Sequence, residues 1–100
     1  MIYLDNASTT KPSQNAKAAV LDAMEQFGNP SSLHRLGMDA EKVVEKAREA
    51  VANRLGAVKK TVFFTSGGTE ANNTAIFGAA RALEKRGKHV ITSSIEHPSV

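Results

Sequence analysis

Apolar residues recur every three or four positions in two stretches of the first half of the chain, the spacing of amphipathic helices. The first stretch predicts a helix that Ser13 caps, that runs to about Phe27 and that Gly28 terminates. The second predicts a longer helix from near Ser32 to Gly56. The positions expected to be buried are Ala16, Ala19, Val20, Ala23, Met24 and Phe27 in the first helix, and Leu33, Leu36, Ala40, Val43, Ala47, Val51 and Leu55 in the second.

The second half of the chain alternates short apolar runs with one further helical pattern. Thr61–Thr65 consists of strand formers and is too short for a helix, so it predicts a buried strand. The turn at 66–68 contains two glycines and breaks this pattern, and Thr69 is predicted to cap a helix that ends at Gly87. A second strand is predicted at His89–Ser93, followed by a loop.

The expected order is helix, helix, strand, helix, strand. A strand, a crossover helix and a second strand of these lengths predict a parallel pair with a right-handed crossover. We therefore expect an α/β fold, the start of a mainly parallel sheet with crossover helices. Parallel sheets rarely contain only two strands, so we expect this fold to be incomplete and the chain to be the beginning of a larger α/β protein.

The turn between the first strand and the third helix is a candidate anion site. The first amides of a helix have no partner within it and point beyond its end. Glycines at 67 and 68 let a ligand approach the backbone, and the hydroxyls of Ser66 and Thr69 can add hydrogen bonds. The spacing matches neither a Walker loop nor GxGxxG. The alternative is an ordinary strand-to-helix turn with a cap.

His97 lies in the loop that leaves the second predicted strand. Ligands of open parallel sheets bind beyond the carboxyl ends of the strands, so this loop and the turn at 66–69 are expected to face one crevice. Histidine titrates near neutrality and could act there as an acid or a base. By itself, a histidine before a proline is more often an exposed surface residue.

Composition narrows the classes of function. One hundred residues make about one small domain, and the absence of cysteine removes disulfides, cysteine-based metal sites and a thiol nucleophile. We predict no metal site. The net charge of +3 is spread out, which disfavours nucleic-acid binding. No run of apolar residues is long enough to span a membrane, and no basic-then-apolar leader opens the chain, so we expect a cytoplasmic protein.

Four short stretches together resemble a known family. They are YLDNASTT at Tyr3–Thr10, GNPSSLH at Gly28–His34, FTSGGTEANN at Phe64–Asn73 and EHPSV at Glu96–Val100. In this order they are similar to the N-terminal quarter of NifS-like cysteine desulfurases, which are class V aminotransferases and pyridoxal-phosphate (PLP) enzymes of fold type I. Residues 13–100 then correspond to the first part of the large PLP-binding domain, and residues 1–12 to an N-terminal segment near the active site.

The resemblance implies roles for individual residues. Gly68 and Thr69 match the phosphate-binding pair of the family, and His97 matches the histidine that stacks on the coenzyme ring and assists proton transfer. Asn6 and Ala7 match a loop near the substrate carboxylate. Ser31, Ser32 and His34 belong to a shared motif whose chemical role the sequence does not identify.

The reaction implied by the resemblance converts L-cysteine to L-alanine and transfers sulfur to an enzyme cysteine. The sulfur then passes to an iron–sulfur scaffold or another acceptor, and a homodimer is expected. The lysine that binds PLP and the acceptor cysteine follow residue 100 in the family, so these 100 residues alone should be inactive. Alternatives are a selenocysteine lyase or aminotransferase of the same superfamily, or a non-enzymatic phosphate-binding module.

Overall fold

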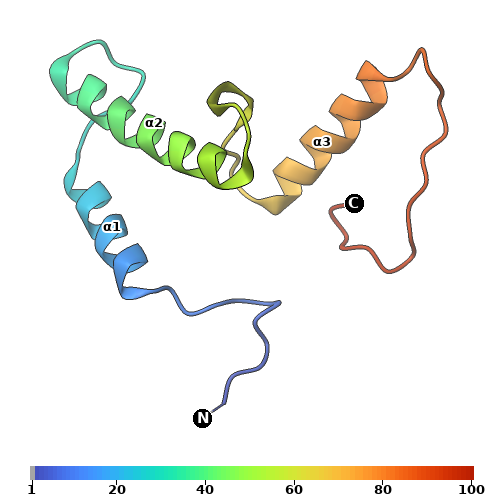
Figure 1. Ribbon diagram of the computed structural model, residues 1–100, viewed down its shortest axis with the longest axis horizontal. Helices are drawn as coiled ribbons and strands as arrows, with labels where there is room; N and C mark the ends of the chain where they lie inside the picture. Colours follow the sequence, from blue (N-terminus) through green and yellow to red (C-terminus); the bar gives the residue numbers. More distant parts are fainter. Residues whose placement is uncertain (1) are drawn as a thin grey trace. The chain divides into compact units, whose positions relative to one another are not determined.

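The structure is a computed structural model that describes residues 2–100, and all of its regular elements are helical (Figure 1). They are α1 (Gln14–Glu25), α2 (Arg35–Leu55), the short 3₁₀ helix η1 (Lys59–Thr61) and α3 (Gly68–Ala82). The described residues form two units, 2–62 and 63–100, and each is considered separately.

Helix α1 begins as the sequence predicts and ends earlier. The Ser13 hydroxyl accepts a hydrogen bond from the Ala16 amide at 3.1 Å, which satisfies one of the free amides of the first turn. The helix stops at Glu25, and Gln26 follows in an extended conformation. Gly28 therefore does not terminate α1 in a left-handed conformation, contrary to the prediction.

Helix α2 begins three residues later than predicted and ends where predicted. His34 precedes its first turn, and its Nδ1 atom accepts a hydrogen bond from the Gly37 amide at 3.3 Å. At the other end Gly56 has φ of 62° and ψ of 26°, a left-handed conformation that glycine adopts without steric cost. The helix cap thus gives His34 a structural role within the shared motif.

Two glycines allow the loop before α2 to lie against the first turn of this helix. A Cβ atom on Gly28 would lie 2.4 Å from the Leu36 carbonyl oxygen. A Cβ atom on Gly37 would lie 2.2 Å from the Ser32 carbonyl oxygen and 2.7 Å from that of Asn29. These neighbours are backbone atoms, so a side chain at either glycine would force the loop away from α2.

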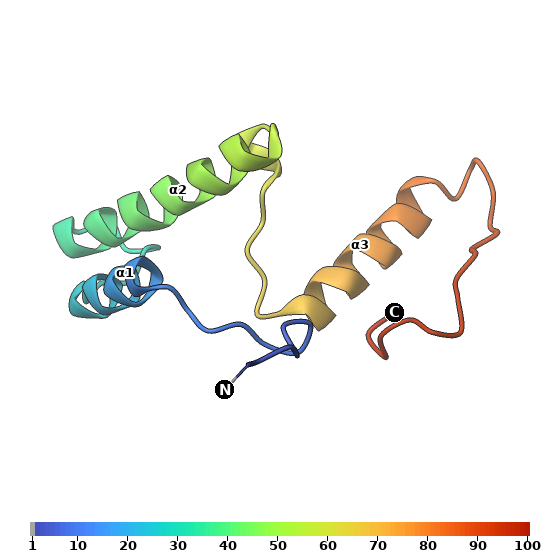
Figure 2. The ribbon, with the colours of Figure 1, turned by 60° about the horizontal axis from the view of Figure 1, so that its bottom comes forward.

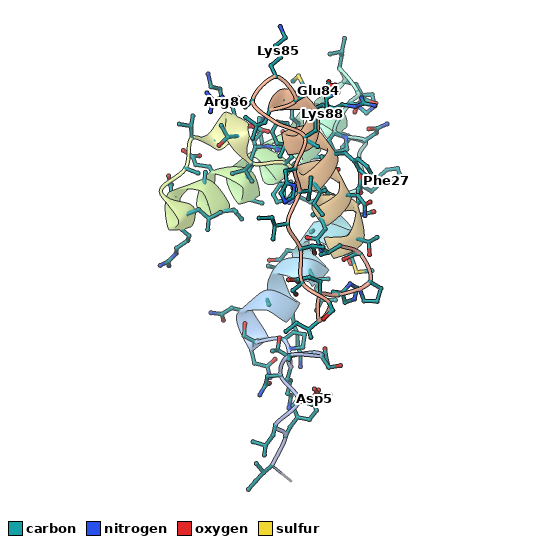
Figure 3. All side chains as sticks on the ribbon, turned by 90° about the vertical axis from the view of Figure 1, so that its right-hand side faces the viewer. Asp5, Phe27, Glu84, Lys85, Arg86 and Lys88 are labelled. Atoms are coloured by element: carbon teal, nitrogen blue, oxygen red, sulfur yellow. The ribbon has the colours of Figure 1, made fainter. Side chains whose placement is uncertain are left out.

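Little of the predicted apolar surface of α1 and α2 is buried. Ala40 and Ala52 are the buried hydrophobic residues among those described. The Phe27 side chain retains 83% of its exposure, and its ring extends away from the ribbon (Figure 3). The apolar stripes have the predicted helical spacing, but no described segment covers most of their length. Exposed patches of this kind mark surfaces that another chain segment or a partner can cover.

No strand occurs within residues 2–100, so the predicted α/β fold with a parallel sheet is wrong for this structure. Part of the first predicted strand is used by η1, whose turn closes through a hydrogen bond from the Thr61 amide to the Val58 carbonyl oxygen at 2.8 Å. Side chains of α2 hold this turn: the Arg48 guanidinium donates to the Val62 carbonyl oxygen, and Glu45 pairs with Lys59 at 2.7 Å.

The second predicted strand, His89–Ser93, is also not part of a sheet. The beginning of this segment lies beside α3 instead. Residues 87–91 line one hollow of about 530 Å³ together with Ile76, Ala79 and Leu83 of the helix and the turn after it. A strand requires a neighbouring strand to accept and donate its backbone hydrogen bonds, whereas a helix satisfies its own. The local pattern therefore produces helices in these 100 residues without producing a sheet.

The second unit consists of α3 and the segment that follows it. Turns at residues 83–86 end the helix before the predicted stop at Gly87. The segment then leaves the C-terminal end of α3 and returns beside its first turns (Figures 1 and 2). This return brings residues 97–99 to the N-terminal end of α3, where the candidate site lies.

Candidate functional site

The site is built on the first turn of α3, where the backbone leaves amide groups without helical partners. Gly67 is the residue that precedes the helix, and its backbone is extended, with φ of 170° and ψ of 179°. No side chain forms a capping hydrogen bond at this end of α3. Thr69, predicted as the cap, is instead the second residue of the helix. The amides of Gly68 and Thr69 thus belong to the part of a helix that attracts anions.

Glu70 is engaged with the turn that precedes α3. One of its carboxylate oxygens accepts hydrogen bonds from both the amide and the hydroxyl of Ser66, each at 2.7 Å. The Ser66 amide, and then its hydroxyl, lower the pKa of Glu70 from its ordinary value of 4.5. The sequence predicted the Ser66 hydroxyl as a further anion ligand. In the structure this hydroxyl instead donates its hydrogen bond to the Glu70 carboxylate.

The returning segment contacts α3 through two consecutive asparagines. The Asn72 side-chain amide donates to the Ser99 hydroxyl at 2.8 Å. The Asn73 side-chain amide donates to the Ser99 carbonyl oxygen at 3.2 Å and to the Thr69 carbonyl oxygen at 2.9 Å. Hydrogen bonds thus hold both the side chain and the backbone of Ser99 to the second turn of α3.

His97 is held by the same serine. The Ser99 amide donates to Nδ1 of His97 at 3.1 Å, and the Ser99 hydroxyl lies 2.8 Å from this nitrogen. A further backbone hydrogen bond, from the Val100 amide to the His97 carbonyl oxygen at 2.8 Å, closes the turn. The imidazole therefore has a defined position relative to Ser99, although its side chain is exposed.

Gly68, Thr69, Asn72, His97 and Ser99 line one hollow of about 330 Å³. The structure thus brings together Gly68, Thr69 and His97, three residues that the sequence proposed for one site. Here a loop folded back on α3 brings them together, whereas the sequence expected the edge of a sheet to do so. Their roles toward a coenzyme stay predictions.

The sequence reasoning did not identify Asn72 and Ser99 as members of the site. Two signals could have indicated them. Residues four apart share one face of a helix, so Asn72 and Asn73 follow Gly68 and Thr69 on the side of the predicted anion site. Ser99 is two positions after His97, which is close enough for a backbone amide to reach the histidine ring.

Asn6 and Ala7 lie in the first unit, in an exposed turn near the start of the chain. The Asp5 carbonyl oxygen accepts hydrogen bonds from the amides of Ser8 at 3.2 Å and Thr9 at 3.4 Å, and Figure 3 marks Asp5 at this turn. The turn exposes small polar residues and backbone atoms. The proposed contact of Asn6 and Ala7 with a substrate carboxylate stays a prediction.

The lysines and arginines of the second unit do not line this hollow. Lys85, Arg86 and Lys88 follow the opposite end of α3, where Lys88 pairs with Glu84 at 3.3 Å (Figure 3). No lysine or arginine lines the hollow. An anion bound there would be held by amides and hydroxyls, with the imidazole of His97 beside it.

Two further observations on residues 2–100 concern membranes and metal ions. None of the helices in this range is long and apolar enough to cross a membrane. Within the same range, no three side chains of the metal-binding types His, Cys, Asp and Glu gather closely enough to hold an ion.

Comparison with known proteins identifies relatives along the whole chain. The chain is 50% identical over 101 residues to a "NifS/IcsS protein homolog" of Lactobacillus delbrueckii subsp. bulgaricus, covering 100% of this chain and 26% of that protein. It is 47% identical over 100 residues to "Cysteine desulfurase IscS" of Dictyoglomus turgidum, covering 99% of this chain and 25% of the relative. The protein of the same name from Methanosarcina thermophila is 46% identical over 100 residues, with 99% and 25% covered.

These relatives confirm the resemblance to NifS-like cysteine desulfurases. The chain spans about a quarter of the length of the curated relatives it matches. No solved structure matches it. The family description "Aminotransferase class-V" matches residues 2–100, which is nearly every residue. The chain therefore belongs to the class-V aminotransferase family.

Proposed function

We propose that this chain is the N-terminal part of a PLP-dependent cysteine desulfurase, which removes sulfur from L-cysteine to leave L-alanine. The names of the relatives support this reaction, and the quarter of their length that matches supports the position within the enzyme. The proposal includes transfer of sulfur to a cysteine outside this cysteine-free chain and onward to an iron–sulfur scaffold or another acceptor. It also includes a cytoplasmic homodimer.

The observation that carries the proposal is the hollow shared by Gly68, Thr69 and His97. Each of these residues was proposed for coenzyme binding from motifs that lie some thirty positions apart in the sequence. A chance resemblance of short motifs gives no reason for them to meet around one hollow. Their meeting at a helix N-terminus supports binding of the coenzyme phosphate there.

The residues present fit a phosphate group. The first amides of α3 supply donors and a favourable helix dipole, and the Thr69 hydroxyl supplies another donor. Glu70, the nearest acidic residue in the helix, is bonded to Ser66 and does not line the hollow. The site thus avoids placing a carboxylate against the anion it would bind.

PLP, when bound, supplies the electron sink that the chemistry of an amino-acid substrate needs. The protein's own residues would bind and orient it: Gly68 and Thr69 at the phosphate, and His97 against the ring. His97 can also hold or move a proton at Nε2, since Nδ1 is occupied by Ser99. Asn6 and Ala7 are proposed to contact the carboxylate of L-cysteine.

The test uses the full-length protein that carries this chain. Purified protein should bind PLP, with the absorption of a protein-bound coenzyme, and should form alanine and sulfide from L-cysteine in the presence of a thiol reductant. Selenocysteine offered in parallel separates a desulfurase from a selenocysteine lyase. Absence of alanine from L-cysteine, with PLP bound, would remove the desulfurase proposal and keep the family.

A pair of variants tests the phosphate site itself. Thr69→Ala should weaken PLP binding by about tenfold to a hundredfold, the loss of one hydrogen bond to a charged group. Thr69→Ser retains the hydroxyl and should bind PLP nearly as the wild type does. Thr74→Ala, in the same helix but outside the hollow, is the matched control and should have no effect. Equal PLP affinity in Thr69→Ala and wild type would contradict the assignment.

A further inference from the structure

We propose that Asn72 and Ser99 are positioning residues that favour the tautomer of His97 protonated at Nε2. The proposal rests on the proposed function for its catalytic consequence, and on geometry alone for the tautomer. The three side chains form a continuous chain of hydrogen bonds, with Asn72 to Ser99 at 2.8 Å and Ser99 to His97 at 2.8 Å. Neither Asn72 nor Ser99 was assigned a role by the motifs.

The direction of these hydrogen bonds follows from the donors available. A backbone amide can only donate, so the bond from the Ser99 amide requires Nδ1 of His97 to be an acceptor without a proton. The neutral imidazole then carries its proton on Nε2. Because Nδ1 has no proton, it cannot donate to the Ser99 oxygen, so in this contact the hydroxyl is the donor and shares the Nδ1 lone pair with the Ser99 amide.

Asn72 completes the chain from the other side. Its side-chain amide nitrogen is a donor, so it occupies a lone pair of the Ser99 oxygen. The hydroxyl proton of Ser99 is then directed to His97 and away from Asn72. Hydrogen bonds arranged head to tail strengthen one another, so each member of the chain favours the same tautomer.

Burial indicates that this contact is selectively protected from solvent. Among residues 63–100, all of which the structure describes, only Asn72, Ile76 and Ser99 are half-buried, and the others are exposed. Two of these three residues, Asn72 and Ser99, form the first link in the chain of hydrogen bonds. Reduced exposure to water strengthens a hydrogen bond and raises the cost of breaking it.

The consequence for the site is a histidine with a single available nitrogen. Nδ1 is committed to Ser99, so only Nε2 can donate or accept a proton at a ligand in the hollow. Loss of the Ser99 hydroxyl leaves the backbone amide as the one donor to Nδ1 and removes the link to Asn72. The ring would then populate the other tautomer more often and would lose part of its fixed orientation.

The test measures the tautomer directly in the full-length protein without PLP. Labelling with ¹⁵N-histidine reports the tautomer of each ring, and a His97→Gln variant assigns the signals of residue 97. At a pH where the ring is neutral, wild type should show Nε2 protonated and Nδ1 unprotonated. Ser99→Ala should raise the ratio of Nδ1–H to Nε2–H tautomer by roughly threefold to tenfold, the effect of one neutral hydrogen bond. Ser99→Thr retains the hydroxyl and should restore the wild-type ratio.

Two further variants show whether a changed tautomer ratio comes from the hydrogen bonds or from misfolding of the Ser99→Ala variant. Asn72→Ala should shift the tautomer ratio in the same direction as Ser99→Ala but less, since the Ser99 hydroxyl remains. Ser94→Ala removes a hydroxyl from the same loop, outside the hollow, and should change nothing. An unchanged ratio in both Ser99→Ala and Asn72→Ala, or a Ser99→Thr variant as altered as Ser99→Ala, would overturn the proposal.

The activity of the PLP-loaded protein gives a separate readout. Ser99→Ala should lower kcat for alanine formation by about threefold to tenfold with little change in KM, and Ser99→Thr should recover it. A wild-type protein that forms no alanine would refute the proposed function, while the tautomer measurement would still decide the roles of Asn72 and Ser99. A normal kcat in Ser99→Ala with an altered tautomer would refute the catalytic consequence alone.

Discussion

Replacing Gly37 by alanine should destabilise the start of α2, although alanine is the better helix former. Removing glycine from a helix interior normally gains about 0.5–1 kcal/mol. At Gly37, however, the new Cβ would lie 2.2 Å from the Ser32 carbonyl oxygen, more than 1 Å inside an ordinary contact of 3.4 Å. The obstacles are backbone atoms of the loop, so they cannot move aside as a side chain can.

The expected net effect is a loss of about 1–2 kcal/mol, because overpacking costs of about 1–3 kcal/mol exceed the propensity gain. The loop would have to leave the helix, and the hydrogen bond from the Ser32 amide to the Asn29 carbonyl oxygen, now 2.9 Å, would weaken. Amide hydrogen exchange at Ser32 and Met38 measures this local opening. Exchange should be about five- to thirtyfold faster in Gly37→Ala than in the wild type.

Gly78→Ala is the matched control. Gly78 lies inside α3, and nothing lies within 4 Å of the Cβ that alanine would add there. This substitution should slow exchange in α3 by the normal gain in helix propensity. If Gly37→Ala slowed exchange around Ser32 as Gly78→Ala slows it in α3, the close approach of loop and helix would be refuted.

Three further predictions concern charge and stability. Because the pKa of Glu70 is lowered from 4.5, its hydrogen bonds to Ser66 stabilise the folded turn above pH 4.5, and this contribution is lost as the pH falls through the lowered pKa. Exchange of the Ser66 amide should show this pH dependence, and Glu70→Gln should abolish it. Lys59→Met should loosen η1 slightly at low salt and have no effect at high salt, when Glu45 and Lys59 are screened; an equal effect at both, measured by exchange at the Thr61 amide, would contradict a Coulombic role. The isolated chain should melt gradually by circular dichroism and bind a hydrophobic dye, since apolar side chains such as Phe27 are exposed; a sharp transition at high temperature would argue otherwise.

The helices could be predicted from the sequence because their signals are local. Ser13 caps α1 and Gly56 ends α2, as their types and positions indicate. The sheet could not be predicted reliably, since a strand depends on partners elsewhere in the chain, and here the start of Thr61–Thr65 pairs with α2 through Val62. Pattern alone treated β-branched residues as a strand and could not foresee the competing 3₁₀ turn.

The candidate site was predicted in part. Gly68, Thr69 and His97 came from motifs, and they line one hollow in the structure. Asn72 and Ser99 were missed because their partnership joins residues 27 positions apart, a separation that no local pattern reveals. The close packing at Gly37 was also hidden, since the sequence shows a glycine in a helix without showing what lies beside it.

The hydrogen bonds of the Ser99 side chain to His97 and to Asn72 differ greatly in sequence separation. Its bonds to His97 join neighbours two positions apart, while its bond to Asn72 closes a loop of 27 positions. Short loops close in tens of nanoseconds, and longer closures cost more entropy. During folding the His97 ring should thus be oriented by Ser99 before this turn docks on α3. Asn72 then forms its hydrogen bond with a turn that is already folded.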